Sequence, residues 1–432
     1  MTGTKQRLGR TVMAQPHVVS FDSATQRLPV RAFNVAGGVL RRFGAAIGNL
    51  DEETLLAAAR ARSGAPDLGS ESWRPALRRL LPALETEARL SPFGRLLARR
   101  AILRCLVNRA RLERDWARHP EILGQSIDRP LIIVGLPRTG TTFLQGLLAQ
   151  DPRHRFLAHW EATSPSPPPG LASHRRDPRR RVGAWDVRVL SYLSPNAVAM
   201  HEVEPNGPQE CVPLLENDFA GFQFISMFSI PTFQRWLETR DLSACYRVFR
   251  QQLQLLQWQR PPQRWLLKSS AHLFAPEALL ALFPDACIVQ LHRHPRTVVA
   301  SYCSLMATLY AIASDAVDPR EIGATWLRTL AHMLEHTMRV RADREPDRFV
   351  DVLYRDLVRD PIATVRAIYR RGGDALSAAA ESSMRAWLAR NPQHKRGVHR
   401  YALDAFGLSE PAVRAAFQPY LTAFDVLEET GE

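Results

Sequence analysis

Residues 131–142 read Leu131-Ile-Ile-Val-Gly-Leu-Pro-Arg-Thr-Gly-Thr-Thr142. A short apolar run breaks into a loop bounded by Gly135 and Gly140, and two threonines open the helix-like stretch that follows. This G-x-x-x-x-G spacing lets successive backbone N–H groups face an anion at a helix N-terminus, where the helix dipole is also positive. We therefore expect a phosphate-binding loop between a strand and a helix.

The loop lacks the lysine that binds a nucleoside triphosphate in a Walker P-loop. That lysine directly follows the second glycine and reaches the β- and γ-phosphates. Here Thr141 occupies the position, and the cation of the loop is Arg138. Thr139 and Thr142 add hydroxyl donors. The pattern favours an anion other than a triphosphate. The main enzymatic alternative to this interpretation is a P-loop kinase that uses ATP and Mg²⁺.

Apolar strands alternate with helices in the part of the chain that contains this loop, which is typical of a parallel sheet with helices on both faces. Further strands are predicted at 264–268, 286–291 and 349–354. We predict an α/β fold, a P-loop-like three-layer α/β/α arrangement around a central parallel sheet.

Cations follow three of the predicted strands: Arg138, Lys268 and Arg293. Ligands of open α/β sheets bind at the carboxyl ends of the strands, so these three side chains are expected to converge at one edge. Three cations at three strand ends indicate a polyanionic ligand.

The chain before the sheet is predicted to be an N-terminal helical extension. Residues 51–60 begin with acidic residues and continue with leucine and alanine, as helices do, and residues 73–111 carry apolar side chains at helical spacing. No catalytic constellation occurs there. The predicted domains are therefore 1–125, the extension, and 126–432, the catalytic domain.

Composition fits a globular enzyme. The chain has 432 residues, of which 45% are apolar, enough for a large core. Its five cysteines show no metal-ligand or C-x-x-C spacing, and no apolar run reaches the length of a signal-peptide core or membrane span. We expect a cytoplasmic protein without a transmembrane segment.

The chain is strongly basic, with 57 Lys and Arg against 43 Asp and Glu, a net charge of +14. This charge favours anionic ligands or surfaces. A nucleic-acid-binding protein is therefore an alternative from another class. Because the basic residues are dispersed and no RNA or DNA motif is recognised, we expect no nucleic-acid partner.

Several of these motifs together resemble the sulfotransferases that use 3′-phosphoadenosine 5′-phosphosulfate (PAPS). The loop at 135–142 is similar to the family's 5′-phosphosulfate loop, in the form found in bacterial and tyrosylprotein sulfotransferases. Arg293 and Ser301, eight residues apart, resemble the family's 3′-phosphate pair. Tyr354 resembles the tyrosine that lies near the adenine. The basic segment at 391–401 is similar to the C-terminal segment that sulfotransferases fold over the 3′-phosphate.

The resemblance implies a PAPS-dependent sulfotransferase that produces a sulfate ester and 3′,5′-ADP without a metal. PAPS carries one phosphosulfate arm and a separate 3′-phosphate, and the sequence offers two anion sites. Sulfuryl transfer, by analogy with phosphoryl transfer, needs positioning and charge neutralisation, a role that suits Arg138 and Lys268. The donor site that the resemblance implies consists of Arg138, Thr139, Gly140, Thr141, Thr142, Arg293, Ser301, Tyr354, Lys395 and Arg396.

An acceptor hydroxyl needs a general base within hydrogen-bond reach. We favour Glu161, whose position resembles that of the catalytic glutamate of tyrosylprotein sulfotransferases. His272, four residues after Lys268, and His201, in a polar segment expected to border the acceptor site, are the alternatives.

The acceptor is expected to be a small molecule, a glycan or a lipid, since a fold and a donor site do not specify the acceptor. An amine could replace the hydroxyl. A non-catalytic sulfotransferase-like scaffold is the remaining alternative, and the sequence does not indicate an oligomeric state.

Overall fold

The computed structural model describes residues 27–65, 67–169, 177–195, 204–261, 263–343, 348–391 and 402–426. At its centre five parallel strands form a sheet in the order β2-β3-β1-β4-β5. The strands are β1 (Leu131–Gly135), β2 (His154–Phe156), β3 (Arg264–Lys268), β4 (Cys287–His292) and β5 (Phe349–Leu353). The predicted α/β fold with a central parallel sheet is confirmed. The four predicted strands match within one residue, and the three-residue strand β2 was not predicted.

The sheet is covered by helices on both faces because buried side chains alternate along β1. Leu131 and Ile133 belong to one apolar cluster, and Ile132 and Val134 to the other. The first cluster includes side chains of α5 (Thr141–Leu148), α16 (Tyr354–Arg359), α17 (Pro361–Arg371) and α18 (Ala378–Arg390). The second includes side chains of α12 (Ser243–Gln257), α13 (Pro276–Leu282), α14 (Pro295–Ala313) and α15 (Pro319–Asp343). The result is the predicted three-layer arrangement.

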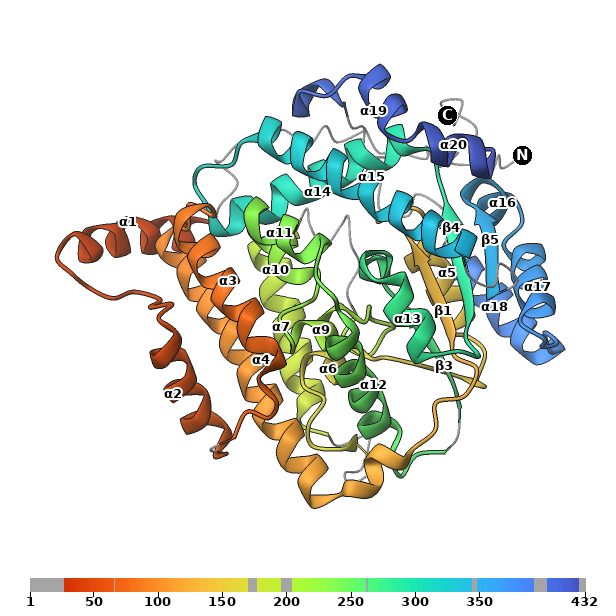
Figure 1. Cartoon of the computed structure of the whole chain (residues 1–432), viewed down its shortest axis with the longest axis horizontal. Coiled ribbons are helices and arrows are strands. Elements are labelled where there is room, and N and C mark those ends of the chain that lie inside the picture. The colour runs from red at the N-terminus through yellow and green to blue at the C-terminus, as the bar shows by residue number, and fades with distance from the viewer. Residues whose placement is uncertain are drawn as a thin grey trace, which may run out of the picture.

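The N-terminal extension is helical, as predicted, and lies opposite the sheet in Figure 1. It contains α1 (Leu28–Arg42), α2 (Glu52–Ser63), α3 (Arg74–Thr86) and α4 (Pro92–Arg118). A carboxylate oxygen of Asp51 accepts the Thr54 N–H at 2.9 Å and caps α2. The predicted helical block 73–111 is divided between α3 and α4. The extension shares one continuous apolar cluster with the rest of the fold, and the domain boundary after residue 125 stays a prediction.

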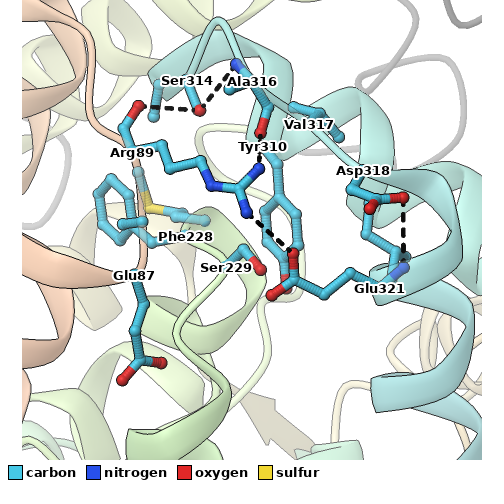
Figure 2. Close-up of a pocket in the computed structure, with 14 residues that line it drawn as sticks. Glu87, Arg89, Phe228, Ser229, Tyr310, Ser314, Ala316, Val317, Asp318 and Glu321 are labelled. Carbon is cyan, nitrogen blue, oxygen red and sulfur yellow. Dashed lines mark hydrogen bonds and ion pairs between the residues drawn. The ribbon is translucent and has the colours of Figure 1, made fainter.

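The start of α4 is fixed against the end of α14. The Ser91 N–H donates to the Ala313 carbonyl at 2.9 Å, and Gly94 can have no side chain because its Cβ would lie 1.9 Å from that same oxygen. Figure 2 shows the hollow beside this joint, in which the Arg89 guanidinium approaches the Glu321 carboxylate at 3.8 Å. The hollow measures about 10 Å³, room for no more than about one water, so it is part of the joint.

The remaining helices fill the space between the extension and the sheet or follow it. Between β2 and β3 lie α6 (His159–Thr163), α7 (Arg179–Leu193), α9 (Val212–Glu216), α10 (Gln223–Met227) and α11 (Pro231–Glu238). Near the C-terminus lie α19 (Glu410–Ala416) and α20 (Gln418–Phe424). Of the described helices, α14 alone is long and apolar enough to cross a membrane by length and composition, but 67% of its most apolar window is buried within the fold, as in any core helix.

Candidate active site

The loop between β1 and α5 has a backbone that glycine makes possible. Gly140, with φ 91°, is the N-cap of α5, and a Cβ there would lie 2.9 Å from Cδ2 of Tyr354. Gly135, with φ 145°, would place a Cβ 2.9 Å from the Leu291 carbonyl of β4. Arg138 also has a left-handed backbone, with φ 70°. The loop is thus closely fitted between β4 and the end of β5, with the N-terminus of α5 open to an anion.

The cations predicted to meet at the sheet edge do meet. Nε of Arg138 donates to Oγ of Ser301 at 3.1 Å, and Nη1 of Arg293 donates to the Arg138 carbonyl at 3.0 Å. The Arg293 guanidinium also lies 3.9 Å from the centre of the Tyr354 ring, a cation–π distance. Four residues, two that follow β1 and β4 and two from α14 and α16, therefore form one connected group, although Arg138 and Tyr354 are far apart in the sequence.

Lys268 completes the cationic end of the site from β3. Its Nζ lies 3.0 Å from Oγ1 of Thr142 and 2.5 Å from a carboxylate oxygen of Glu210. The same carboxylate accepts Oγ of Ser269 through its other oxygen at 3.4 Å. Because the Lys268 side chain is buried at the edge of the loop, an anion bound there would compete with Glu210 for its ammonium group.

A cavity of about 860 Å³ leads away from these cations. At its polar end it is lined by Arg138, Gly140, Thr141, Thr142, Lys268, Arg293 and Tyr354. The remainder is lined mainly by apolar side chains of α4, α7, α10 and α14: Leu97, Ala101, Val187, Val189, Leu190, Leu193, Met227, Leu305, Met306, Leu309 and Ile312. One cavity therefore joins an anion site to a long apolar chamber, and α4 of the extension forms part of its wall.

Comparison with known proteins explains this combination. A sequence model described as the sulfotransferase family matches residues 130–375, more than half of the chain. The chain belongs to the sulfotransferase family. That membership accounts for the loop, the cations and the parallel sheet together.

Solved structures of sulfotransferases share the fold over most of its length. STF1 from Mycobacterium tuberculosis H37Rv has a TM-score of 0.77 and 32% identity, covering 85% of this chain and 98% of that one. STF9 from Mycobacterium avium has a TM-score of 0.80 and 32% identity, covering 88% and 98%. Because 85% of the chain is more than the part that begins at β1, the similarity extends into the N-terminal helices.

Curated relatives carry a more specific name. The omega-hydroxy-beta-dihydromenaquinone-9 sulfotransferases Stf3 of Mycobacterium bovis and Mycobacterium tuberculosis are each 25% identical over 295 residues, covering 64% of this chain and 71% of the relative. The family and these relatives support sulfuryl transfer as the activity of this chain.

Not every residue predicted for the sulfotransferase site reaches the cavity. Thr139 is buried, and its hydroxyl donates to the Leu136 carbonyl at 2.7 Å, so it closes the loop from within. Ser301 is buried and contacts the site through Arg138. Lys395 and Arg396 lie outside the described residues. Their part in donor binding stays a prediction.

Glu161, the predicted base, is buried away from the cavity wall. One carboxylate oxygen lies 3.2 Å from Nη2 of Arg155, and the other accepts the Ala158 N–H at 3.2 Å. Arg260 lies 3.9 Å from the same carboxylate. The carboxylate therefore has local partners that the sequence did not reveal, and the geometry gives its proposed proton transfer no support.

The predicted histidines are no better placed. His272 is buried, one of its ring nitrogens lies 2.9 Å from the Tyr246 hydroxyl, and it is not among the residues that line the cavity. Burial lowers the pKa of His272 to about 3, so the ring stays neutral. His201 lies outside the described residues.

Glu210 and its neighbours are the site residues that the sequence did not single out. The segment is fixed beside β3 because the Cys211 N–H donates to the Lys268 carbonyl at 3.0 Å. It belongs to the polar stretch that was expected to border the acceptor site, but His201 was selected there. The sequence does not show which polar residue of the stretch reaches Lys268, whereas the backbone hydrogen bond to β3 identifies it as Glu210.

His159 lines the same cavity beside Glu210, and its tautomer follows from its partner. Oε1 of Gln209 accepts the Glu210 N–H at 2.8 Å, which turns the Gln209 amide NH₂ toward Nδ1 of His159, 2.8 Å away. Nδ1 is then an acceptor, and the proton of the neutral ring is on Nε2. Burial lowers the pKa of His159 and favours this neutral form. His159 can thus donate a hydrogen bond but is not a base in this arrangement.

Proposed function

We propose that the protein transfers a sulfuryl group from PAPS to a hydroxyl group of an elongated, apolar acceptor and releases 3′,5′-ADP. The observation that carries the proposal is the cavity of about 860 Å³, which is lined by Arg138, Lys268 and Arg293 at one end and mainly by apolar side chains elsewhere. A donor with two separate anionic groups suits the cationic end. An acceptor with a large apolar surface suits the rest.

The donor's two anionic groups have separate partners in this proposal. Arg138, the Thr141 and Thr142 hydroxyls and the N-terminus of α5 hold the 5′-phosphosulfate. Arg293 and Ser301 hold the 3′-phosphate, and the Tyr354 ring packs near the adenine. Thr139 and Gly140 shape the loop, and Lys395 and Arg396 keep their predicted contacts to the 3′-phosphate. No metal is needed, because these cations neutralise the leaving phosphate.

The transfer itself would be an in-line displacement. The acceptor oxygen bonds to sulfur while the bond from sulfur to the phosphate oxygen breaks, and the electron pair leaves with 3′,5′-ADP. Lys268 and Arg138 neutralise the charge that develops on the transferring and leaving oxygens. Glu210 takes the acceptor proton on the carboxylate oxygen that Nζ of Lys268 contacts, since donor binding draws this ammonium group toward the phosphosulfate.

The relatives support the proposed type of acceptor. Their name states that they act on omega-hydroxy-beta-dihydromenaquinone-9, a hydroxylated menaquinone derivative. The apolar wall built by α4, α7 and α14 suits a molecule of that kind. We place the reaction in the cytoplasm, since the five cysteines are all free thiols.

Thermal-shift titration tests the donor site. We expect 3′,5′-ADP without metal to stabilise the protein and ATP with Mg²⁺ to do so weakly. Arg293→Ala removes a charged hydrogen bond to phosphate of about 1.5–3 kcal/mol, so affinity for 3′,5′-ADP should fall about 10- to 150-fold. Arg296→Ala is the matched control, because Arg296 lies three residues further along, in the first turn of α14, but pairs with Glu410 at 3.3 Å.

Two outcomes contradict the proposal: a preference for ATP, or 3′,5′-ADP affinity in the Arg293 variant equal to that of Arg296→Ala. The acceptor class is tested by supplying PAPS with a hydroxylated polyprenyl compound or a short phenol. Faster release of 3′,5′-ADP with the phenol would show that the apolar chamber does not select the acceptor.

A further inference from the structure

The outward face of α1 is apolar where a surface helix is normally polar. Leu28, Val35 and Phe43, which directly follows the helix, are 77%, 71% and 86% exposed, and Val39 and Leu40 lie between them. An exposed apolar stripe of this size marks a surface that another body covers.

The opposite face of α1 is fully used for packing. Val30 is buried, the Asn34 side-chain oxygen accepts the Phe93 N–H at 2.9 Å, and a Cβ on Gly37 would lie 2.7 Å from Cβ of Pro92. These contacts fix α1 on the start of α4. In Figure 1, α1 lies at the outer edge of the molecule. The exposed stripe is therefore not the inner face of a displaced helix.

Helix α7 continues this surface. Nε of Arg27, the residue before α1, donates to the Tyr192 carbonyl of α7 at 3.0 Å, so the two helices meet end to end. On α7, Trp185 is 61% exposed, and Val182 and Tyr192 are exposed as well. Tryptophan and tyrosine beside arginine are typical of side chains at a membrane interface.

The charge of the two helices favours an anionic partner. Within their bounds, α1 and α7 contain seven arginines and one acidic residue, Asp186. Asp186 is neutralised by Arg100 of α4 at 2.6 Å. Five of the arginines are exposed: Arg31, Arg41, Arg42, Arg181 and Arg188. Apolar side chains flanked by arginine are the pattern of helices that lie in the surface of a bilayer containing anionic lipids.

The surface is also continuous with the cavity. One face of α7 is exposed, and its other side contributes Val187 and Leu190 to the cavity wall. On α4, which supports α1, Leu96 is exposed and its neighbour Leu97 lines the cavity. The same two helices thus contribute exposed apolar side chains to the surface and apolar side chains to the chamber, and the ion pair of Arg100 and Asp186 lies between them.

We propose that α1 and α7 form a docking surface for the face of a lipid bilayer that carries anionic lipids. The proposal goes beyond sulfuryl transfer, since the docking needs neither donor nor acceptor. The apolar side chains enter the interface, and the arginines contact the lipid phosphates.

Vesicle sedimentation with the full chain tests this proposal. We expect binding to vesicles of phosphatidylcholine with about one third phosphatidylglycerol, much weaker binding to phosphatidylcholine alone, and release by high salt. Val35→Glu combined with Phe43→Glu on α1, and Trp185→Glu on α7, should each lower binding about tenfold or more. Leu123→Glu is the control, because Leu123 is also exposed but lies beyond the far end of α4.

All these substitutions are on exposed side chains, and unchanged thermal unfolding would show that the variants are folded. The proposal is wrong if the wild type does not bind the anionic vesicles, or if either the α1 or the α7 variant binds as well as Leu123→Glu. It is also wrong if the wild type does not bind vesicles but forms dimers and the α1 variant is monomeric, since a second copy of the chain would then cover the surface. Because no donor or acceptor is present, these outcomes are independent of the proposed reaction.

Discussion

Replacing Glu210 by Gln tests the proposed base most directly. A glutamine oxygen can still accept Nζ of Lys268, 2.5 Å away in the wild type, so the lysine should keep its place. The amide cannot take a proton. General-base catalysis contributes about 10²- to 10⁴-fold, so kcat should fall by that factor, or about 3–5 kcal/mol of transition-state stabilisation. The KM for PAPS should change only a few-fold, because the donor cations are intact.

Release of 3′,5′-ADP measures kcat, and a binding titration with 3′,5′-ADP checks the donor site. Glu161→Gln is the comparison, since that residue is the base predicted from sequence. Removing its charge leaves the buried Arg155 guanidinium without its carboxylate and costs about 3–5 kcal/mol of stability, so rates must be compared per folded molecule. The reasoning is refuted if Glu210→Gln keeps kcat within about threefold of the wild type, or if Glu161→Gln loses as much kcat as Glu210→Gln while fully folded.

Two further predictions concern stability. Gly140→Ala should lower the free energy of unfolding in urea by more than Gly64→Ala. Both positions have positive φ, so an alanine costs about 1–2 kcal/mol at either one, but only at Gly140 does the added Cβ meet Tyr354. Equal losses would show that the close contact has no energetic weight. Burial raises the pKa of Glu216 to about 8, so the folded protein holds the carboxyl proton more tightly than the unfolded chain does. The free energy of unfolding should therefore fall by about 1.4 kcal/mol per pH unit as the pH rises from about 4.5 to about 8. Glu216→Gln should remove that slope in urea unfolding at several pH values, and identical slopes in both proteins would contradict the assigned cause.

The convergence of the cations at one edge of the sheet could be predicted because parallel strands impose it. Arg138 and Arg293 follow neighbouring strands, so any correct assignment of β1 and β4 brings them to the same edge. The helix that follows β4 carries Ser301 back to Arg138 at 3.1 Å. Local patterns in the sequence were sufficient for each of these positions.

The position of Glu210, the base that we propose, could not be predicted, because it depends on contacts between distant segments. Glu161 contacts Arg155 and the backbone at the start of its own helix, and no spacing in the sequence indicates these contacts. Glu210 reaches Lys268 only because the chain after residue 204 lies against the end of β3. The sequence also did not predict that one face of α1 is apolar and exposed. Hydrophobic residues occupy more of this helix surface than packing requires, so the pattern does not separate the packed face from the exposed one.

Helix α4 has a consequence for how this protein could diversify. It spans about 40 Å and supplies part of the apolar chamber, whereas the glycine-bounded loop follows β1 in a separate layer. Mutations along one side of α4 can therefore reshape the chamber while the proposed donor site keeps its residues. Related proteins that act on different acceptors would then differ mainly along this helix, and a mutagenesis library restricted to Leu97, Ala101 and Arg104 would test this consequence.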